Sequence, residues 1–81
     1  MYYVYIIKCG DNTLYTGITV DIKRRFKEHQ SGKGGAYTRS KGVKRVLYIE
    51  KLKNRSLALK REAEIKKWPH DKKSALVNNY A

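Results

Sequence analysis

The sequence has little cysteine, proline or acidic side chain, and no long apolar run. Its 81 residues include one Cys and one Pro, which excludes an internal disulfide framework and a Cys-based zinc site. No segment approaches the ~18 apolar residues of a membrane span, and the segment MYYVYIIKCG shows neither a basic leader nor a cleavage site. We therefore expect a single small intracellular domain over residues 1–81, cytoplasmic and nucleoid-associated if the source is bacterial or archaeal.

Basic residues, in contrast, are abundant. The chain has 19 Lys and Arg residues against 7 Asp and Glu residues, a formal charge of +12. Such a charge on so short a chain indicates a polyanionic partner, and nucleic acid is the commonest. The basic residues lie within periodic segments as well as between them, unlike those of a disordered basic tail. A highly soluble domain, or one that binds an acidic protein, is the alternative.

The residue patterns predict an α+β domain of order ββαβαα, with a three-stranded, mainly antiparallel sheet flanked by helices. Residues 2–9 and 14–20 are rich in aromatic and β-branched side chains, as strands are. Turn residues between them predict a hairpin, and residues 45–52 alternate as a third strand. The expected helices begin at Asp21 and end by Gly32, run from Asn54 or Ser56 to about Lys67, and cover residues 71–80.

Glu62 interrupts an apolar stripe on the second expected helix. The apolar positions are Ala58, Leu59 and Ile65. Helical spacing places Glu62 on the same side, facing the domain, and Glu64 on the opposite, basic side together with Arg61. A carboxylate turned inward is costly unless it is paired or holds a cation. An ion pair with an Arg and a metal site are both open interpretations.

Arg25 and His29 form a second polar feature at the edge of an apolar helix face. They are four residues apart and flank Phe26, so both side chains can project into one cleft. Both residues also have non-functional interpretations: Arg25 can form an ion pair with Asp21, and His29 can have a purely structural role.

The hairpin tyrosines are the third feature. Tyr3 and Tyr5 share one strand face because side chains alternate with a period of two. A hairpin loop of odd length would put Tyr15 and Gly17 on that same face. Glycine inside a strand often marks a close approach of the backbone to another group. The alternative is that these aromatic rings simply pack a small core.

These residues resemble a known pattern. The segments Tyr3-Val4-Tyr5 and Tyr15-Thr16-Gly17 are similar to the two tripeptides of the GIY-YIG endonuclease superfamily, although the first lacks its Gly and Ile and the second its middle Ile. Arg25 and His29 follow in the family's order, and the stretch ending at Glu62 looks like the helix that carries the family's metal-binding Glu. The resemblance covers roughly residues 2–77 and points to the small stand-alone single-domain members.

The resemblance implies a divalent-metal-dependent DNA endonuclease that hydrolyses phosphodiester bonds with little sequence specificity, as in DNA repair or recombination. A preference for branched, nicked or single-stranded DNA stays open, as does RNA as the substrate. The implied roles are one Mg²⁺ or Mn²⁺ ion on Glu62, water activation by Tyr5 or Tyr15, phosphate binding by Arg25, proton transfer or phosphate binding by His29, and backbone approach at Gly17.

Two positions depart from the patterns of some members. Ile18 stands where some have a Lys near the base, and Ser74 stands where some have an Asn. A nucleic-acid-binding module without turnover is therefore the alternative function, and for either function we expect a monomer.

Basic side chains outside this constellation are expected to grip the DNA backbone. Such contacts give affinity and salt dependence but no sequence readout. They lie on the first expected helix and in or beside the loop before the third strand: Arg24, Lys27, Lys33, Arg39, Lys41, Lys44 and Arg45.

Overall fold

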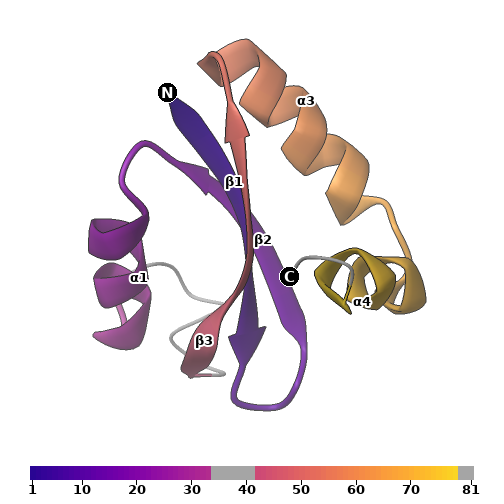
Figure 1. Ribbon diagram of the computed structural model, residues 1–81. Coiled ribbons are helices and arrows are strands. Elements are labelled where there is room, and N and C mark those ends of the chain that lie inside the picture. Colours follow the sequence, from indigo (N-terminus) through magenta and orange to yellow (C-terminus); the bar gives the residue numbers. More distant parts are fainter. Residues whose placement is uncertain (34–41, 79–81) are drawn as a thin grey trace.

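The computed structural model describes residues 1–33 and 42–78 (Figure 1). Its elements are β1 (Tyr2–Cys9), β2 (Leu14–Thr19), α1 (Ile22–Gln30), β3 (Val43–Leu52), α3 (Arg55–Lys66) and α4 (His70–Asn78). The strands form one sheet of order β2-β1-β3 in which both pairings are antiparallel. The predicted α+β fold and the order ββαβαα are confirmed. Within the described ranges, no helix has the length and apolarity needed to cross a membrane.

The helices cover the two faces of the sheet unequally. Figure 1 shows α1 on one side and α3 with α4 on the other. We call these the α1 face and the α3 face. On the α3 face, β1 contributes Val4 and Ile6, both without solvent exposure, to a core that includes Ala58 and Ile65 of α3. On the α1 face, β1 contributes Tyr5 and Ile7, which line a narrow crevice with residues of α1.

The hairpin register decides which residues share the α1 face. Tyr5 pairs with Gly17 and Ile7 pairs with Tyr15. This register corresponds to a hairpin loop of odd length, which was the condition for a shared face. Tyr5, Tyr15 and Gly17 therefore lie on one face of the sheet. The turn closes through a hydrogen bond from the Cys9 amide to the Thr13 carbonyl of 2.8 Å.

Side-chain caps fix where two helices begin. The Asp21 carboxylate accepts a hydrogen bond from the Arg24 amide at 3.0 Å, and the Asn54 side chain accepts one from the Leu57 amide at 2.9 Å. Both caps satisfy amides that have no partner inside the helix, so the predicted N-cap at Asp21 is confirmed, as is the earlier of the two starts expected for α3. The third helix begins at His70, because the Pro69 carbonyl already accepts from Lys72 and Lys73.

The expected solvent and core sides of α3 need two corrections. Leu59 is 37% exposed, so the apolar stripe is narrower than predicted. Arg61, expected on the solvent side, turns toward β3, where its Nε donates to Glu50 Oε1 at 3.1 Å. It also pairs with Glu64 and lies 5.2 Å from the centroid of the Trp68 ring. A partly buried acid on the neighbouring strand, which no helical pattern includes, draws it inward.

Candidate active site

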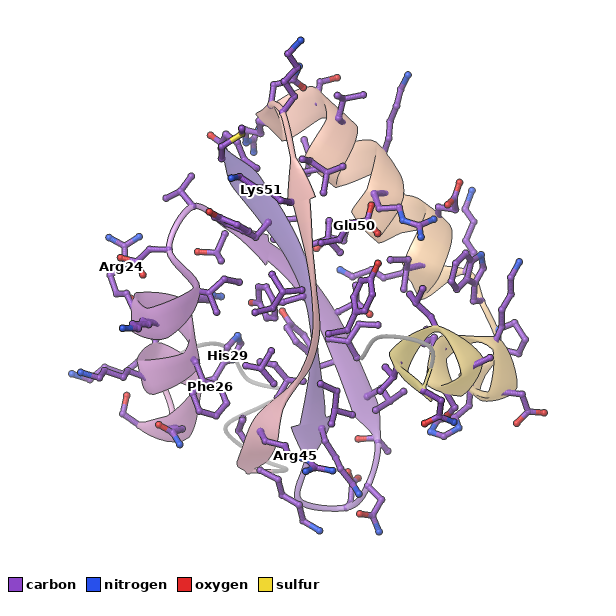
Figure 2. All side chains as sticks on the ribbon, viewed as in Figure 1. Arg24, Phe26, His29, Arg45, Glu50 and Lys51 are labelled. Carbon is purple, nitrogen blue, oxygen red and sulfur yellow. The ribbon has the colours of Figure 1, made fainter. Side chains whose placement is uncertain are left out.

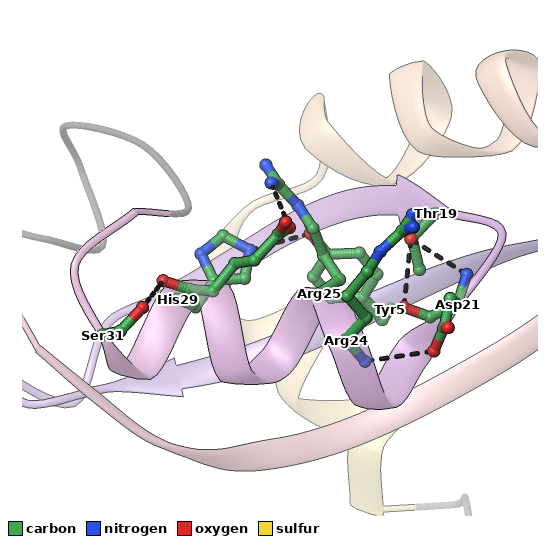
Figure 3. Close-up of polar contacts among 8 residues, drawn as sticks. Tyr5, Thr19, Asp21, Arg24, Arg25, His29 and Ser31 are labelled. Carbon is green, nitrogen blue, oxygen red and sulfur yellow. Dashed lines mark hydrogen bonds and ion pairs between the residues drawn. The ribbon is translucent and has the colours of Figure 1, made fainter.

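A chain of three polar side chains crosses the space between β1 and α1 (Figure 3). Tyr5 is 2% exposed and His29 is 1% exposed. The Tyr5 hydroxyl lies 2.9 Å from Nε2 of His29. Arg25 Nε donates to the same hydroxyl over a longer 3.4 Å. The phenol oxygen is therefore held between a cation and an imidazole inside the domain.

The helical period of α1 explains this placement. Phe26 and His29 are three residues apart, and in Figure 2 both point from α1 toward the sheet, whereas Arg24 points away. Arg25 lies between these two sides, partly exposed. Arg25 and His29 therefore share one cleft, as their spacing allows, and both contact the Tyr5 hydroxyl there.

Burial and charge set the protonation states of this chain. Burial raises the pKa of Tyr5, the hydrogen bond and charge of Arg25 oppose that rise, and the charges of Tyr15 and Glu62 add to it. Arg25 acts in the direction that activation of the phenol requires, but desolvation outweighs it. Burial and the charge of Arg25 lower the pKa of His29, against a smaller opposing effect of Glu28. At neutral pH, Tyr5 is a phenol and His29 a neutral imidazole.

These protonation states order the hydrogen bonds. Arg25 can only donate, so the Tyr5 oxygen accepts from it. In the tautomer of neutral His29 that carries its ring proton on Nδ1, the Tyr5 hydroxyl donates to Nε2. A proton that left Tyr5 would pass to His29 over 2.9 Å.

Tyr15 and Gly17 close the site on the β2 side. The rings of Tyr15 and His29 meet edge to face, with centroids 5.3 Å apart. A Cβ on Gly17 would lie 2.6 Å from the Tyr5 hydroxyl and 3.2 Å from Cε2 of Tyr15. Only glycine leaves room for the Tyr5 ring against β2, so the predicted close approach at Gly17 is present.

Arg25 pairs with Glu28 and not with Asp21. Its Nη1 lies 3.0 Å from Glu28 Oε1, in a bridge that is partly exposed at both ends. Asp21 is engaged in capping α1. Among the described residues, the carboxylate that pairs with Arg25 is therefore that of Glu28, in place of the Asp21 carboxylate considered from the sequence.

Glu62 faces inward, as predicted, with 18% of its side chain exposed. Its ion-pair partner is Lys66, 3.4 Å away on the next turn of α3, so among the described residues the partner is a Lys and not the Arg of the first interpretation. In the described parts of the chain, Glu62 forms its ion pair with Lys66 and not with Arg25 or His29. Its charge nevertheless acts on Tyr5 and helps to raise the pKa of that phenol.

The donor set limits the kind of metal site. In residues 1–33 and 42–78, no group of three or more His, Cys, Asp or Glu side chains could enclose an ion. Mg²⁺ commonly keeps several waters and binds one or two carboxylates together with substrate phosphates. Glu62 fits such an ion, whose remaining ligands are water and phosphate, and does not fit an ion held by protein alone.

A second inward acid, Glu50, was missed by the sequence interpretation. Its Oε1 accepts from the Tyr48 hydroxyl at 2.6 Å and from Arg61 at 3.1 Å. Figure 2 shows Glu50 on β3 where the strand faces α3. The alternation Tyr48, Glu50, Leu52 could have revealed it, because all three share a strand face. Since Arg61 neutralises Glu50, this carboxylate is engaged in the fold.

Ile18 and Ser74, the two positions that depart from the pattern of some family members, place no polar group next to Tyr5. Ile18 packs against the core on the α3 face, and Ser74 Oγ lies 3.4 Å from His70 Nδ1 on α4. The site thus contains no cation at the position where some members have a Lys.

The basic side chains expected to grip DNA are distributed around the molecule. Arg24, Lys27 and Lys33 are exposed on or just after α1, and Lys44 is exposed on β3 with its Nζ donating to Asn12 Oδ1 at 3.3 Å. Arg45 is also exposed on β3. Arg39 and Lys41 lie outside the described residues.

The fold and this arrangement define a class: a small α+β catalytic domain with hairpin tyrosines, an Arg and His on the first helix, and an inward Glu on a later one. The family model of the GIY-YIG catalytic domain matches residues 1–75. The chain belongs to the GIY-YIG family. Membership in this family implies a nuclease-type domain whose substrate is a nucleic acid.

Its relatives are proteins named UPF0213. One from Syntrophus aciditrophicus is 49% identical over 76 residues, covering 93% of this chain and 87% of the relative. Another from Haloquadratum walsbyi is 45% identical over 76 residues, covering 94% and 85%. A UPF0213 protein from Bacillus halodurans, with a structure solved by NMR in solution, is 42% identical with a TM-score of 0.61, covering 96% of this chain and 84% of that one. The resemblance to small single-domain members is confirmed.

Proposed function

We propose that this protein is a divalent-metal-dependent DNA endonuclease with little sequence specificity. The observation that carries the proposal is the buried chain from Arg25 through Tyr5 to His29, formed over Gly17. A fold has little need for a phenol between a cation and a neutral imidazole in its interior. Perturbed titratable groups of this kind mark functional sites.

Arg25 is the group proposed to bind the scissile phosphate. Its guanidinium is partly exposed, and its present partner Glu28 is more exposed still. Exposed ion pairs contribute at most about 1 kcal/mol, so exchanging Glu28 for a phosphate costs little. Arginine also suits phosphate geometry, because two of its N–H groups can donate in parallel.

Tyr5 and His29 are proposed to move the proton. As a water oxygen bonds to phosphorus, its proton passes to the Tyr5 oxygen, and the Tyr5 proton passes to Nε2 of His29. The phenol is restored and the imidazole becomes imidazolium, so no free phenolate forms. The bond to the leaving oxygen breaks, and that oxygen takes a proton from solvent. Neutral His29 is the acceptor this step requires.

Glu62 is proposed to hold the divalent ion. When bound, Mg²⁺ or Mn²⁺ supplies positive charge for the phosphate oxygens and the leaving oxygen. The charges of Arg25 and Glu62 both act on Tyr5, so the phosphodiester is expected to bind where these groups converge. Tyr15 lines the same space through its contact with His29.

Exposed cations are proposed to hold the DNA backbone around this site. Arg24 and Lys27 lie on the same helix as Arg25, and Lys33 follows just after its end. Backbone contacts of this kind make binding strongly salt-dependent and insensitive to sequence.

The second candidate is a nucleic-acid-binding module that does not turn over. Two observations favour it: Glu62 is already paired with Lys66, and burial raises the pKa of Tyr5 instead of lowering it. In this case binding is salt-sensitive and no metal produces cleavage.

A cleavage assay separates the two. Wild type, Glu62→Ala and Glu64→Ala are incubated with labelled duplex, single-stranded, flap and four-way-junction DNA in Mg²⁺, Mn²⁺ or EDTA. Glu64 is the matched control because it is an exposed carboxylate on the same helix. We expect metal-dependent cutting by wild type and Glu64→Ala, and none by Glu62→Ala, with DNA binding retained in all three.

Cleavage by purified Glu62→Ala equal to wild type would refute the metal site. Tight binding without cleavage by any of the three proteins would favour the binding module, and RNA would then replace DNA in the same assay.

A further inference from the structure

A second cavity lies on the α3 face, away from Tyr5. It has a volume of about 330 Å³ and lies between one end of the sheet and α4. Three basic side chains line it, Lys8, Arg45 and His70, and no carboxylate is among its lining residues. Figure 2 shows Arg45 near the end of β3.

A β-bulge places Arg45 in this cavity. Ile6 pairs with Tyr48, but Ile7 pairs with Val46, so Leu47 is an extra residue on β3. Without this shift, Val46 would lie opposite Lys8. With it, Arg45 lies opposite Lys8. Bulges re-aim side chains and are common beside functional sites.

The bulge therefore creates a cross-strand pair of like charge. Such pairs are destabilising when they lie directly opposite each other. In the described part of the chain, neither Lys8 nor Arg45 forms an ion pair with a carboxylate. A concave site lined by charge of one sign concentrates the field and attracts counter-ions. An anion in the cavity would offset the repulsion that the register imposes.

The remaining lining suits the body of a ligand larger than phosphate. Leu14, Leu47 and Val77 supply apolar surface, and Asn12 and Asn78 supply amide donors and acceptors. A volume of about 300 Å³ is large enough for a small molecule, and the mixed polar and apolar lining suits one that carries both a charged group and an apolar body.

We propose that this cavity binds a nucleotide, with Lys8 and Arg45 on its phosphate and the apolar wall against its base. The nucleotide is either free or the terminal unit of a nucleic-acid strand, since both present the same chemistry. Phosphate binding by Lys8 and Arg45 is independent of cleavage. The choice of a nucleotide over other phosphate esters rests on the proposed function.

The test is an NMR titration of the ¹⁵N-labelled full chain in EDTA. The probes are inorganic phosphate, deoxyadenosine, deoxyadenosine 5′-monophosphate, and a short single strand with or without a 5′-phosphate. We expect the monophosphate to shift amides around the cavity and to bind at least tenfold more tightly than the nucleoside or phosphate alone. Lys8→Met and Arg45→Met should each weaken it about tenfold. Lys51→Met, an exposed cation on β3 away from the cavity, should not.

Equal binding of nucleoside and monophosphate, or equal loss in Lys8→Met and Lys51→Met, would overturn the proposal. Phosphate alone binding as tightly as the monophosphate would overturn the nucleotide assignment. Tighter binding of the 5′-phosphorylated strand than of the free monophosphate identifies a strand end as the ligand, and the reverse identifies a free nucleotide.

Thermal unfolding gives a second readout. Lys8→Met removes the like-charge contact, so its unfolding midpoint without anion should rise by about 2–4 °C. It should also lose the rise that the monophosphate produces in wild type. A midpoint that falls, with the ligand-induced rise retained, would contradict the assignment. Neither readout involves Tyr5 or cleavage, so failure of the proposed nuclease leaves this result unaffected.

Discussion

The two faces of the sheet use the same strand for different purposes. On the α3 face, Val4 and Ile6 are buried in an apolar core. On the α1 face, Tyr5 is equally buried but contacts His29 and Arg25. Alternate residues of β1 therefore separate stability from chemistry within one strand. The comparison teaches that substitutions one residue apart should affect different properties of the protein.

The largest expected effect is on the α1 face. Tyr5→Phe removes the hydroxyl that passes the proton to His29, and general-base catalysis contributes about 10²–10⁴-fold. We expect the cleavage rate to fall by about that factor. The free energy of unfolding should fall by only about 1–3 kcal/mol, because His29 Nε2 loses a buried partner. Single-turnover cleavage and chemical denaturation measure the two quantities.

The neighbouring residue gives the reverse result. Ile6→Ala leaves a cavity in the α3 core, where Ile6 has no exposure, and should lower the free energy of unfolding by about 2–5 kcal/mol. Cleavage per folded molecule should stay near wild type. If Ile6→Ala loses cleavage at a temperature where it is folded, the separation between the faces fails.

A third substitution tests how tightly the α1 face is packed. In Gly17→Ala the new Cβ would lie 2.6 Å from the Tyr5 hydroxyl, so the ring must shift away from His29. Overpacking of this kind costs about 1–3 kcal/mol, and cleavage should fall as far as in Tyr5→Phe. The double variant with Tyr5→Phe should be no slower than either single variant, because both disrupt the same contact. Additive losses would show that Gly17 acts elsewhere.

The contacts of the two faces also differ in how far the sequence could predict them. Period-two alternation predicted that Tyr5 and Gly17 share a face if the hairpin loop has odd length, and helical spacing predicted that Arg25 and His29 share a cleft. Only the family resemblance implied that the two pairs meet. These patterns did not predict that Arg61 turns toward Glu50, since that contact joins a helix to the strand before it and depends on how the two pack. Nor did they predict Arg45 opposite Lys8, because the bulge at Leu47 reverses the faces that unbroken alternation would give to Val46 and Arg45.

The pH dependence of the α1 face follows from His29. Its pKa is lowered from 6.5 by burial and by Arg25. Between that lowered value and 6.5 the unfolded chain binds a proton that the folded chain does not, so stability falls as pH decreases below 6.5. Cleavage should fall at the still lower pH where folded His29 becomes protonated and can no longer accept from Tyr5.

The second histidine supplies the control. His29→Gln should lose the stability slope just below pH 6.5, and His70→Gln, which replaces an exposed histidine on α4, is the matched substitution. Denaturation across this range, with cleavage measured alongside, checks both variants. An unchanged slope in His29→Gln would show that another group titrates there.

The smallest expected effect is that of substituting Thr16, which precedes Gly17 and faces the core. Thr16 is 3% exposed, and its Oγ1 has no hydrogen-bond partner in the described part of the structure. It pairs with Ile6 and therefore faces α3. Replacing an unsatisfied buried hydroxyl by a methyl of similar shape is neutral or stabilising. Thr16→Val should raise the free energy of unfolding by up to about 1 kcal/mol and leave cleavage unchanged.

Thr19→Val is the matched control at the end of the same strand. The Thr19 hydroxyl accepts from the Asp21 amide at 3.1 Å and donates to the Asp21 carbonyl at 3.2 Å, so its loss should lower the free energy of unfolding by about 1 kcal/mol. If Thr16→Val raises the free energy of unfolding and Thr19→Val lowers it, the Thr16 hydroxyl is an unused polar group on the α3 face. It would lie one residue from Gly17, the glycine that the α1 face requires. If Thr16→Val instead lowers both stability and cleavage, the hydroxyl serves the site across β2, and the division of the strand between stability and chemistry is wrong at this residue.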